Sequence, residues 1–240
     1  MKKLALIIGT ILFGCTLSAK AQDISFESDD NKPFLGVRLG LDISCPTDWK
    51  ISNIGENGAS MSLPLFNNGA GFDLGAVYNI PLWKNLYFEP GLSIYYNTMG
   101  CSVTIADDPE FGTSDDLSGS IRRFGFRIPF QVGYRVDFTD LDFSLSAFTG
   151  PVLTAGLVGR QHATIQYDGL KESGSESVYG HDGFLNRVDV GWKIGVGAEY
   201  NNFVLQLSGT IGMCNMLSGA INTKYRDNNV ALTVGYNFFL

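Results

Sequence analysis

The sequence is poor in charge and has no long apolar run beyond its first residues. Charged side chains make up 17% of the 240 residues, and histidine occurs twice. After residue 21, no stretch offers the roughly 18 consecutive uncharged apolar residues of a membrane-spanning helix. This absence excludes a helical membrane protein. The low charge and the 29 glycines are also unusual for a soluble helical protein.

Cysteine is scarce too, and its four copies indicate no disulfide framework. Cys15 lies in the N-terminal apolar run, where bulky Phe13 disfavours the alternative of a lipoprotein signal acylated at this cysteine. Cys45, Cys101 and Cys214 are left for the folded protein. Because this number is odd, at most one intramolecular bridge can form, and the sequence does not decide whether any of them pair.

The N-terminal segment has the pattern of a cleaved secretion signal. Two lysines precede an apolar run, and residues 19–21 form a small-x-small triplet. We therefore predict a signal peptide over residues 1–21, a polar lead over 22–33 and one barrel domain over 34–240.

Cleavage at this point makes the protein more acidic. It removes Lys2, Lys3 and Lys20 from the 17 basic residues, which leaves 14 against 24 acidic residues and a net charge of −10. Overall charge therefore does not attract the protein to nucleic acid or to anionic lipid. We expect no nucleic-acid partner.

Eight segments alternate apolar and polar residues with the period of two that is typical of β-strands. In the first, Val37 and Leu39 face one side and Arg38 the other. Each segment has about the 9–11 residues that a tilted strand needs to cross a bilayer. The segments are 34–44, 71–80, 86–97, 123–136, 141–150, 188–200, 203–213 and 229–240.

The connections between these segments alternate in length. Three are short turns, and the other four are long and hold most of the Gly, Ser, Asn and Asp, at roughly 45–69, 99–120, 159–185 and 214–228. Short periplasmic turns and long extracellular loops are the layout of outer-membrane barrels. We therefore predict an all-β fold, an eight-stranded antiparallel up-and-down transmembrane β-barrel.

Alternation alone does not say which strand face lies inside. A transmembrane barrel turns its apolar face outward, whereas a soluble lipocalin-like barrel turns it inward around a ligand. The charges on the polar face nearly cancel, as expected of ion pairs buried in a lumen. We predict a lumen charge network of Arg38, Asp42, Asp73, Glu89, Arg123, Arg127, Arg135, Asp142, Asp189, Lys193 and Glu199.

Glycine and aromatic residues favour the same choice of face. The polar face is rich in glycine, which relieves crowding inside a small closed barrel. Aromatic residues, among them Tyr78, Trp83 and Tyr200, gather near the predicted strand ends, as they do at membrane interfaces. We therefore expect the polar face to line the lumen, and the lipocalin-like barrel remains as the alternative.

The last eight residues carry a recognisable pattern. They match the C-terminal signal of outer-membrane barrel proteins at Thr233, Gly235, Phe238 and Leu240, with Leu in place of the commoner final Phe. This resemblance implies that the barrel assembly machinery recognises the segment during insertion. With its signal sequence, its size and its Gly/Tyr-rich strands, the chain also resembles the PorT-like outer-membrane β-barrel family of Bacteroidetes. That resemblance implies a location in the Gram-negative outer membrane, in contact with its lipid, and a family in which some members assist secretion or gliding machinery.

The expected lumen of an eight-stranded barrel is just wide enough for side chains, which disfavours a wide porin. We expect a structural or interaction role through the extracellular loops, with no cofactor, and the sequence does not identify the physiological partner. The alternative is an outer-membrane lipid-modifying enzyme, similar to PagL-type deacylases or PagP-type acyltransferases, which needs a nucleophile and a base. No family motif surrounds the candidates for these roles, so we expect no enzyme; they are His162, Asp168, Ser173, Ser175, Ser177, His181 and Asp182.

An acidic stretch between two predicted strands raises the question of calcium. Carboxylate oxygens are the ligands that Ca²⁺ prefers, but the stretch lacks the spacing of an EF-hand loop. An acidic surface loop is the commoner explanation, so we expect no metal site. The acidic residues are Asp107, Asp108, Glu110, Asp115 and Asp116.

Overall fold

A computed structural model describes residues 32–46, 68–104, 116–138, 141–167, 170–180, 183–217 and 225–240. This part of the chain contains nine β-strands, and every pairing between them is antiparallel. The strands are β1 (Phe34–Ser44), β2 (Gly69–Trp83), β3 (Leu86–Thr104), β4 (Asp116–Phe138), β5 (Phe143–Tyr167), β6 (Leu170–Ser177), β7 (Val188–Tyr200), β8 (Phe203–Gly212) and β9 (Asn229–Phe239).

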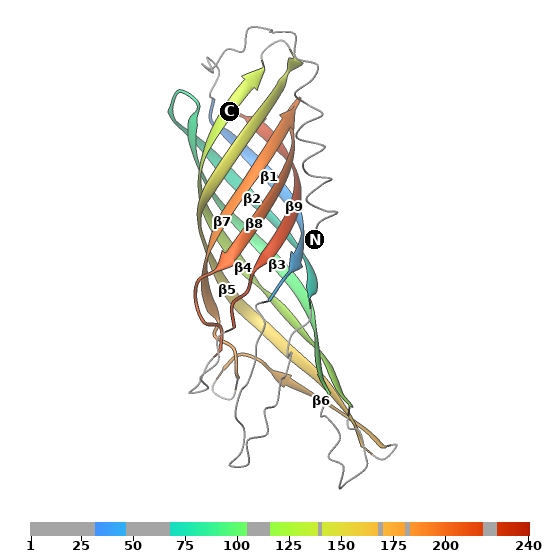
Figure 1. Cartoon of the computed structure of the whole chain (residues 1–240). Coiled ribbons are helices and arrows are strands. Elements are labelled where there is room, and N and C mark those ends of the chain that lie inside the picture. Colours follow the sequence, from blue (N-terminus) through green and yellow to red (C-terminus); the bar gives the residue numbers. More distant parts are fainter. Residues whose placement is uncertain are drawn as a thin grey trace.

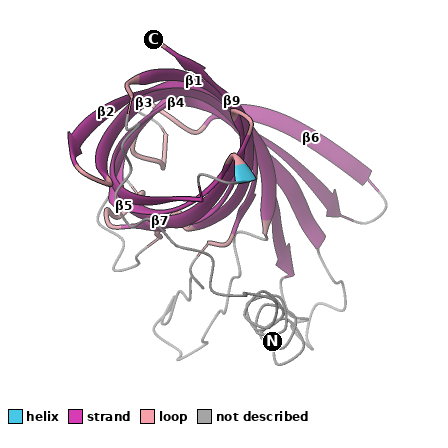
Figure 2. Ribbon diagram, turned by 90° about the horizontal axis from the view of Figure 1, so that it is seen from above, coloured by secondary structure: helices cyan, strands magenta, loops and turns pink. Residues whose placement is uncertain are grey.

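Eight of these strands close into a barrel. The sheet order is β4-β3-β2-β1-β9-β8-β7-β5-β6, and an additional pairing between β4 and β5 joins the ring. The last strand, β9, pairs with β1 along the whole length of β1, from Phe34 opposite Phe239 to Ser44 opposite Asn229. Viewed along the barrel, β6 lies outside the ring (Figure 2). The predicted eight-stranded antiparallel barrel is confirmed.

The apolar face of the strands points outward. Along β1, buried and exposed side chains alternate without exception. Arg38 is 5% exposed, whereas the neighbouring Leu39 is 47% exposed. The soluble lipocalin-like alternative is therefore wrong, because it requires the apolar face to line the interior. In the described part of the chain, no helix is both long enough and apolar enough to span a membrane.

Short turns join the strands at one end of the barrel, which we call the short-turn end. Between β7 and β8, Tyr200 pairs with Phe203 and leaves a two-residue turn of Asn201 and Asn202. Both asparagines have positive φ, 46° and 73°. A type I′ hairpin turn needs this conformation at both positions, and asparagine tolerates it better than most residues. The C-terminus lies at the same end (Figure 1). The opposite end is the long-loop end.

At the long-loop end, β3 to β6 continue as a projecting sheet that we call the wing. The wing comprises 98–104 of β3, 116–122 of β4, 157–167 of β5 and all of β6 (Figure 1). The predicted loops 99–120 and 159–185 are therefore wrong in part, because both contain strand residues. Serine and glycine are frequent in the wing, so the two faces of its strands differ little in hydropathy and the sequence shows no clear strand pattern.

Candidate functional site

Ion pairs occupy the lumen at the short-turn end. Arg38 Nη2 lies 3.7 Å from Glu89 Oε2, and Arg135 Nη2 lies 3.4 Å from Glu199 Oε2. The Arg135 guanidinium also stacks over the ring of Phe34, with its Cζ 5.0 Å from the ring centroid. Phe34 is fully buried. Paired charges and aromatic rings therefore fill this part of the barrel.

A second group of charges surrounds Arg127 further along the lumen. Arg127 Nη2 lies 3.4 Å from Asp42 Oδ2, and its Nη1 lies 3.8 Å from Asp73 Oδ2. The Asp42 side chain is fully buried. The guanidinium also lies over the ring of Tyr95 at 4.6 Å. One arginine thus compensates two acids from β1 and β2, which reduces the cost of placing these charges in the interior.

A small cavity lies beside these residues. Its volume is about 60 Å³, and its lining includes Arg38, Asp73, Arg127 and Lys193. Since one water molecule needs roughly 10–15 Å³, the cavity has room for a few waters but not for a lipid chain. Lys193 forms no ion pair with any carboxylate in the described part of the chain, and its Nζ lies 5.7 Å from the ring centroid of Phe148.

The predicted charge network needs one correction. Asp142 does not face the lumen: it is exposed, and it lies in the turn before β5 with a φ of 48°. The sequence pattern extended the strand to residue 141, whereas β5 begins at Phe143. Asp189 is buried at the start of β7 but, among the described residues, it has no ion-pair partner.

Asp227, which no sequence pattern indicated, contributes the shortest ion pair among the described residues. Arg123 Nη2 lies 2.7 Å from Asp227 Oδ2, and the two side chains are 2% and 11% exposed. Asp227 precedes β9, in a region predicted to be loop, so strand periodicity gave no signal for it. The same Arg123 nitrogen also donates a hydrogen bond of 3.4 Å to Asn97 Oδ1.

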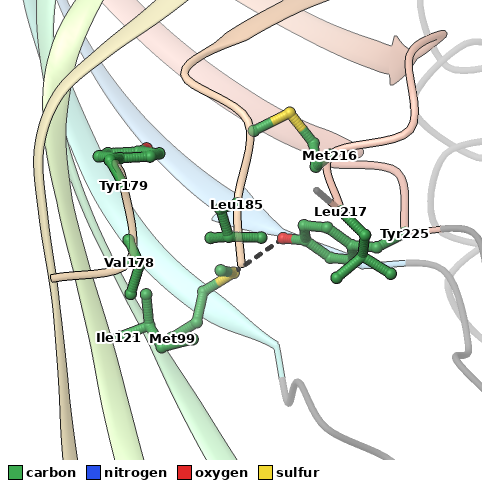
Figure 3. Packing of buried hydrophobic residues seen from close by; sticks show 8 residues of the cluster. All are labelled: Met99, Ile121, Val178, Tyr179, Leu185, Met216, Leu217 and Tyr225. Atoms are coloured by element: carbon green, nitrogen blue, oxygen red, sulfur yellow. Dashed lines mark hydrogen bonds between the residues drawn. The ribbon is translucent and has the colours of Figure 1, made fainter. Parts of the chain in front are cut away.

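Apolar side chains occupy the long-loop end of the lumen, in a cluster that we call the plug. Met99 and Ile121 come from the inward faces of β3 and β4, and the other members come from segments between strands (Figure 3). All are at most 7% exposed. The cluster consists of Met99, Ile121, Val178, Tyr179, Leu185, Met216, Leu217 and Tyr225.

Backbone hydrogen bonds hold the plug segments to one another. Leu185 N donates to Val178 O at 3.0 Å, and Met216 N donates to Tyr225 O at 2.9 Å. Leu185 and Leu217 also form an isolated antiparallel bridge. The described parts of the loops after β6 and β8 and of the segment before β9 therefore pack together, and their backbone groups hydrogen-bond to one another.

Two tyrosine hydroxyls belong to the plug. Burial, with a smaller contribution from Asp227, raises the pKa of Tyr225 well above its ordinary value. Burial, with a smaller contribution from Tyr95, also raises the pKa of Tyr179. Both phenols therefore stay protonated at neutral pH. The Tyr225 hydroxyl donates to Met99 Sδ at 3.6 Å, which the dashed line in Figure 3 marks.

Glycine makes room for Tyr179 against the barrel wall. A Cβ atom on either Gly156 or Gly159 of β5 would collide with the Tyr179 ring. Val178 N donates to Gly159 O at 3.0 Å and fixes the adjacent residue at the same place. Absence of a side chain at these two positions thus permits the close approach.

The four residues of the C-terminal pattern lie in or directly after β9. Thr233 is buried, so it is on the lumen side, whereas Phe238 and Leu240 are 50% and 74% exposed on the outward side. Gly235 pairs with Arg38 of β1 and Val204 of β8. The pattern therefore belongs to the strand that closes the barrel, and its recognition by assembly machinery stays a prediction.

The structure brings together only part of the candidate enzyme residues. His162 is exposed in the wing and lies directly opposite Ser175 of β6. Ser173 and Ser177 are on the same strand, whereas Asp168, His181 and Asp182 lie outside the described residues.

The candidate calcium ligands fall largely outside the described part of the chain. This applies to Asp107, Asp108, Glu110 and Asp115, while Asp116 begins β4. Within the described residues, no group of three or more His, Cys, Asp or Glu could hold a metal ion. Cys45 and Cys214 are free, and the side chain of Cys101 is outside the description.

The match to a family model agrees with this architecture. A family model described as "Outer membrane protein beta-barrel domain" matches residues 9–218. No curated protein matches the chain. Similar solved structures include the attachment invasion locus protein Ail of Yersinia pestis, with 14% identity, 86% of this chain and 99% of that chain covered, and a TM-score of 0.36. Neisserial surface protein A has 13% identity, coverages of 85% and 97%, and a TM-score of 0.39. LpxR from Salmonella typhimurium has 9% identity, coverages of 85% and 100%, and a TM-score of 0.29.

Proposed function

The chain belongs to the outer membrane protein beta-barrel domain family, and from this premise we propose that it is a closed small barrel that acts through its exposed surface. It lies in the cell outer membrane. The proposed role is structural or interactive, through the wing and the long loops, and it is neither that of a wide pore nor that of an enzyme. The finer assignment to the PorT-like family of Bacteroidetes is part of this proposal.

One observation supports this role more than any other: the lumen is filled at both ends. At the long-loop end the plug sits beside the buried Arg123–Asp227 ion pair. At the short-turn end Arg135 covers Phe34 and pairs with Glu199. The cavity of about 60 Å³ between them is too small for a solute path. A protein with a filled lumen presents its outer surface and its loops for function.

The wing is the surface that we propose for partners. In outer-membrane barrels the short turns face the periplasm and the long loops face outward, so the wing projects from the cell. Its partners would be other surface proteins or surface polysaccharide, and its body would contact outer-membrane lipid. Insertion would use the barrel assembly machinery through Thr233, Gly235, Phe238 and Leu240.

The enzyme alternative has little support in the wing. Ser175 and His162 form a cross-strand pair, but the register partners of His162 are the serines Ser120 and Ser175, so no carboxylate lies directly opposite the histidine to orient it. We therefore propose a protein without a catalytic site. Replacing His162 by alanine should not change the structure of lipid A, so mass spectra of lipid extracted from the variant and from the wild type should be the same.

Conductance tests the closed lumen. The purified full chain is inserted into planar bilayers, and we expect no steady channel because side chains fill both ends of the lumen. A stable open conductance of the wild-type protein, with the size expected of a porin, would contradict the proposal.

Antibody access tests the exposed wing. An epitope is inserted between Tyr167 and Leu170, and a matched control carries it in the turn at Lys84 and Asn85. We expect the first epitope to be detected on intact cells and the second only after permeabilisation. The reverse result would contradict the orientation.

Cross-linking on intact cells tests the interaction role. The wild type is compared with a variant that lacks residues 161–176, a deletion that joins the register partners Arg160 and Ser177. We expect both to show the gel shift on heating of a folded barrel, and the deletion to lose the cross-linked partners of the wild type. Identical cross-links in both would assign the interactions to another surface.

A further inference from the structure

Two arginines face each other on the outward side of the wing. Arg122 of β4 lies directly opposite Arg160 of β5 in the antiparallel register. Both side chains are exposed, and neither forms an ion pair with a described residue. Side chains directly opposite in an antiparallel pair have Cβ atoms about 4.5–5.5 Å apart, so the two guanidinium groups can converge on one ligand.

The residues around this arginine pair are hydroxyl-bearing or basic. Thr98 lies opposite Arg122 on β3, and Ser177 lies opposite Arg160 on β6. One step further out, His162 lies between Ser120 and Ser175. Among the described side chains of this face, none is a carboxylate. Glu176 of β6 is exposed too, but it alternates to the opposite face of the wing.

This arrangement costs stability unless an anion accompanies it. Like charges directly opposite each other destabilise an antiparallel pair. Arginine is also the residue whose planar fork best matches the oxygens of phosphate, and hydroxyl groups add further donors. The face therefore has the composition of a phosphate-binding surface, although the protein as a whole is acidic.

The depth of the arginine pair indicates where the phosphate comes from. The next outward residues toward the barrel body are Phe124 on β4 and Val158 on β5. These two residues are directly opposite each other and are 37% and 53% exposed. A step of two residues along a strand is about 7 Å, and a strand tilted by roughly 40° converts it to about 5 Å along the membrane normal. The arginines thus lie at headgroup level, directly above side chains that face the hydrocarbon.

We propose that Arg122 and Arg160 form a binding site for the phosphate groups of outer-leaflet lipid. The neighbouring Thr98, Ser120 and Ser177 donate further hydrogen bonds to the same headgroup. Because the headgroup is bound at the membrane surface, the site anchors the wing against the bilayer. The inference rests on the proposed function in one respect, the outward orientation of the wing, but it does not depend on whether the lumen conducts.

A lipid titration tests this site. The full chain in uncharged maltoside micelles is titrated with diphosphorylated lipid A, and separately with the same lipid after removal of its phosphates. The midpoint of the heat-induced gel shift gives the apparent affinity. We expect the phosphorylated lipid to bind at least about tenfold more tightly, since charge-assisted hydrogen bonds to phosphate are the strong ones. Equal effects of the two lipids would overturn the proposal without using any variant.

Two matched variants assign the binding to the arginine pair. R122Q/R160Q removes two positive charges from the wing, and K32Q/K84Q removes two near the short-turn end. We expect the first to lose about tenfold in affinity for the phosphorylated lipid and the second to stay within about twofold of the wild type. R122K/R160K keeps the charge but not the fork, and an intermediate loss is expected. Equal losses in R122Q/R160Q and K32Q/K84Q would overturn the proposal.

Inorganic phosphate separates a lipid site from a site for free anions. We expect millimolar phosphate to compete weakly with the lipid and to give little stabilisation alone. Stabilisation by inorganic phosphate equal to that by the lipid would overturn the lipid source. A conducting protein that still binds the phosphorylated lipid would refute the proposed closed lumen and leave this inference intact.

Discussion

Along β4, the body of the barrel and the wing have faces of opposite polarity. In the body, Arg123 faces the lumen and Phe124 faces outward. Two residues nearer the wing on β4, Ile121 is buried in the plug and Arg122 is exposed on the outward face. The exchange takes place within four consecutive residues. The position where the two faces of a continuous strand exchange polarity is the position where the strand leaves the hydrocarbon core of the membrane.

Different interactions hold the interior of the barrel at its two ends. In the body, the interior is held by ion pairs around Arg127 and Arg38. At the long-loop end the interior is held by apolar packing around Leu185 and Met99. Removing one partner of an ion pair should therefore destabilise the body, whereas truncating a buried apolar side chain should destabilise the plug.

Arg127→Leu should have the largest effect. It leaves Asp42 and Asp73 without their cation, and breaking a buried ion pair costs about 3–5 kcal/mol. The expected result is a large drop in the midpoint of the heat-induced gel shift. The matched control, Arg187→Leu, removes an exposed arginine of the loop before β7 and should cost less than about 1 kcal/mol. Equal losses would show that the Arg127 pairs do not stabilise the body.

Leu185→Ala should have the next largest effect, and it acts on the plug. Leu185 is 2% exposed, and truncation of a buried leucine costs about 2–5 kcal/mol when a cavity remains. We expect proteolysis of the long-loop end at a lower protease concentration, together with brief openings in planar bilayers. The control is Leu141→Ala in the exposed turn before β5. An unchanged protease pattern and silent bilayers would contradict the packed plug.

Gly133→Val tests the crowding of the lumen. A Cβ atom at Gly133 would collide with the ring of Tyr87, and overpacking costs about 1–3 kcal/mol. Gly174→Val in β6 is the matched control, because a Cβ atom there meets nothing within 4 Å. Thermal midpoints of both variants check the difference. Similar midpoints would mean that Tyr87 moves aside without cost.

Asn202→Ala should have the smallest effect. Alanine tolerates the φ of 73° at this position less well than asparagine does. The substitution also removes the hydrogen bond of 3.0 Å that Asn202 Nδ2 donates to Asn237 O. The expected loss is about 1 kcal/mol, measured by urea unfolding in micelles. Asn202→Gly keeps the backbone freedom and should lose less. A larger loss for glycine than for alanine would contradict the assigned turn.

The body could be predicted from the sequence because its two faces differ strongly. The strand predicted at 34–44 has the bounds of β1, since every outward residue of that segment from Leu35 to Ile43 is a large aliphatic one. The wing could not be predicted with the same rule. Its outward face carries Ser120, Ser175 and His162 beside arginines, and these residues contrast little with the glycines and serines of a loop.

The interior charges were predictable only where they lie on strands. Periodicity placed Arg38, Asp42 and Arg127 on one face, and the structure brings Arg127 and Asp42 into contact. Asp227 pairs with Arg123 from an irregular segment, and Leu185 enters the plug from another. Their positions depend on loops folding back into the barrel, which local sequence patterns do not encode.

The most direct test of the polarity exchange is the depth of four positions on β4. Single cysteines at 121, 122, 123 and 124, in a chain whose native cysteines are replaced by serine, carry a nitroxide label in lipid vesicles. The account predicts that the label at 124 is accessible to oxygen, that the label at 122 is accessible to a water-soluble nickel complex, and that both inward positions are shielded. Equal access to oxygen at 122 and 124 would contradict it, because the strand would then remain in hydrocarbon beyond Phe124.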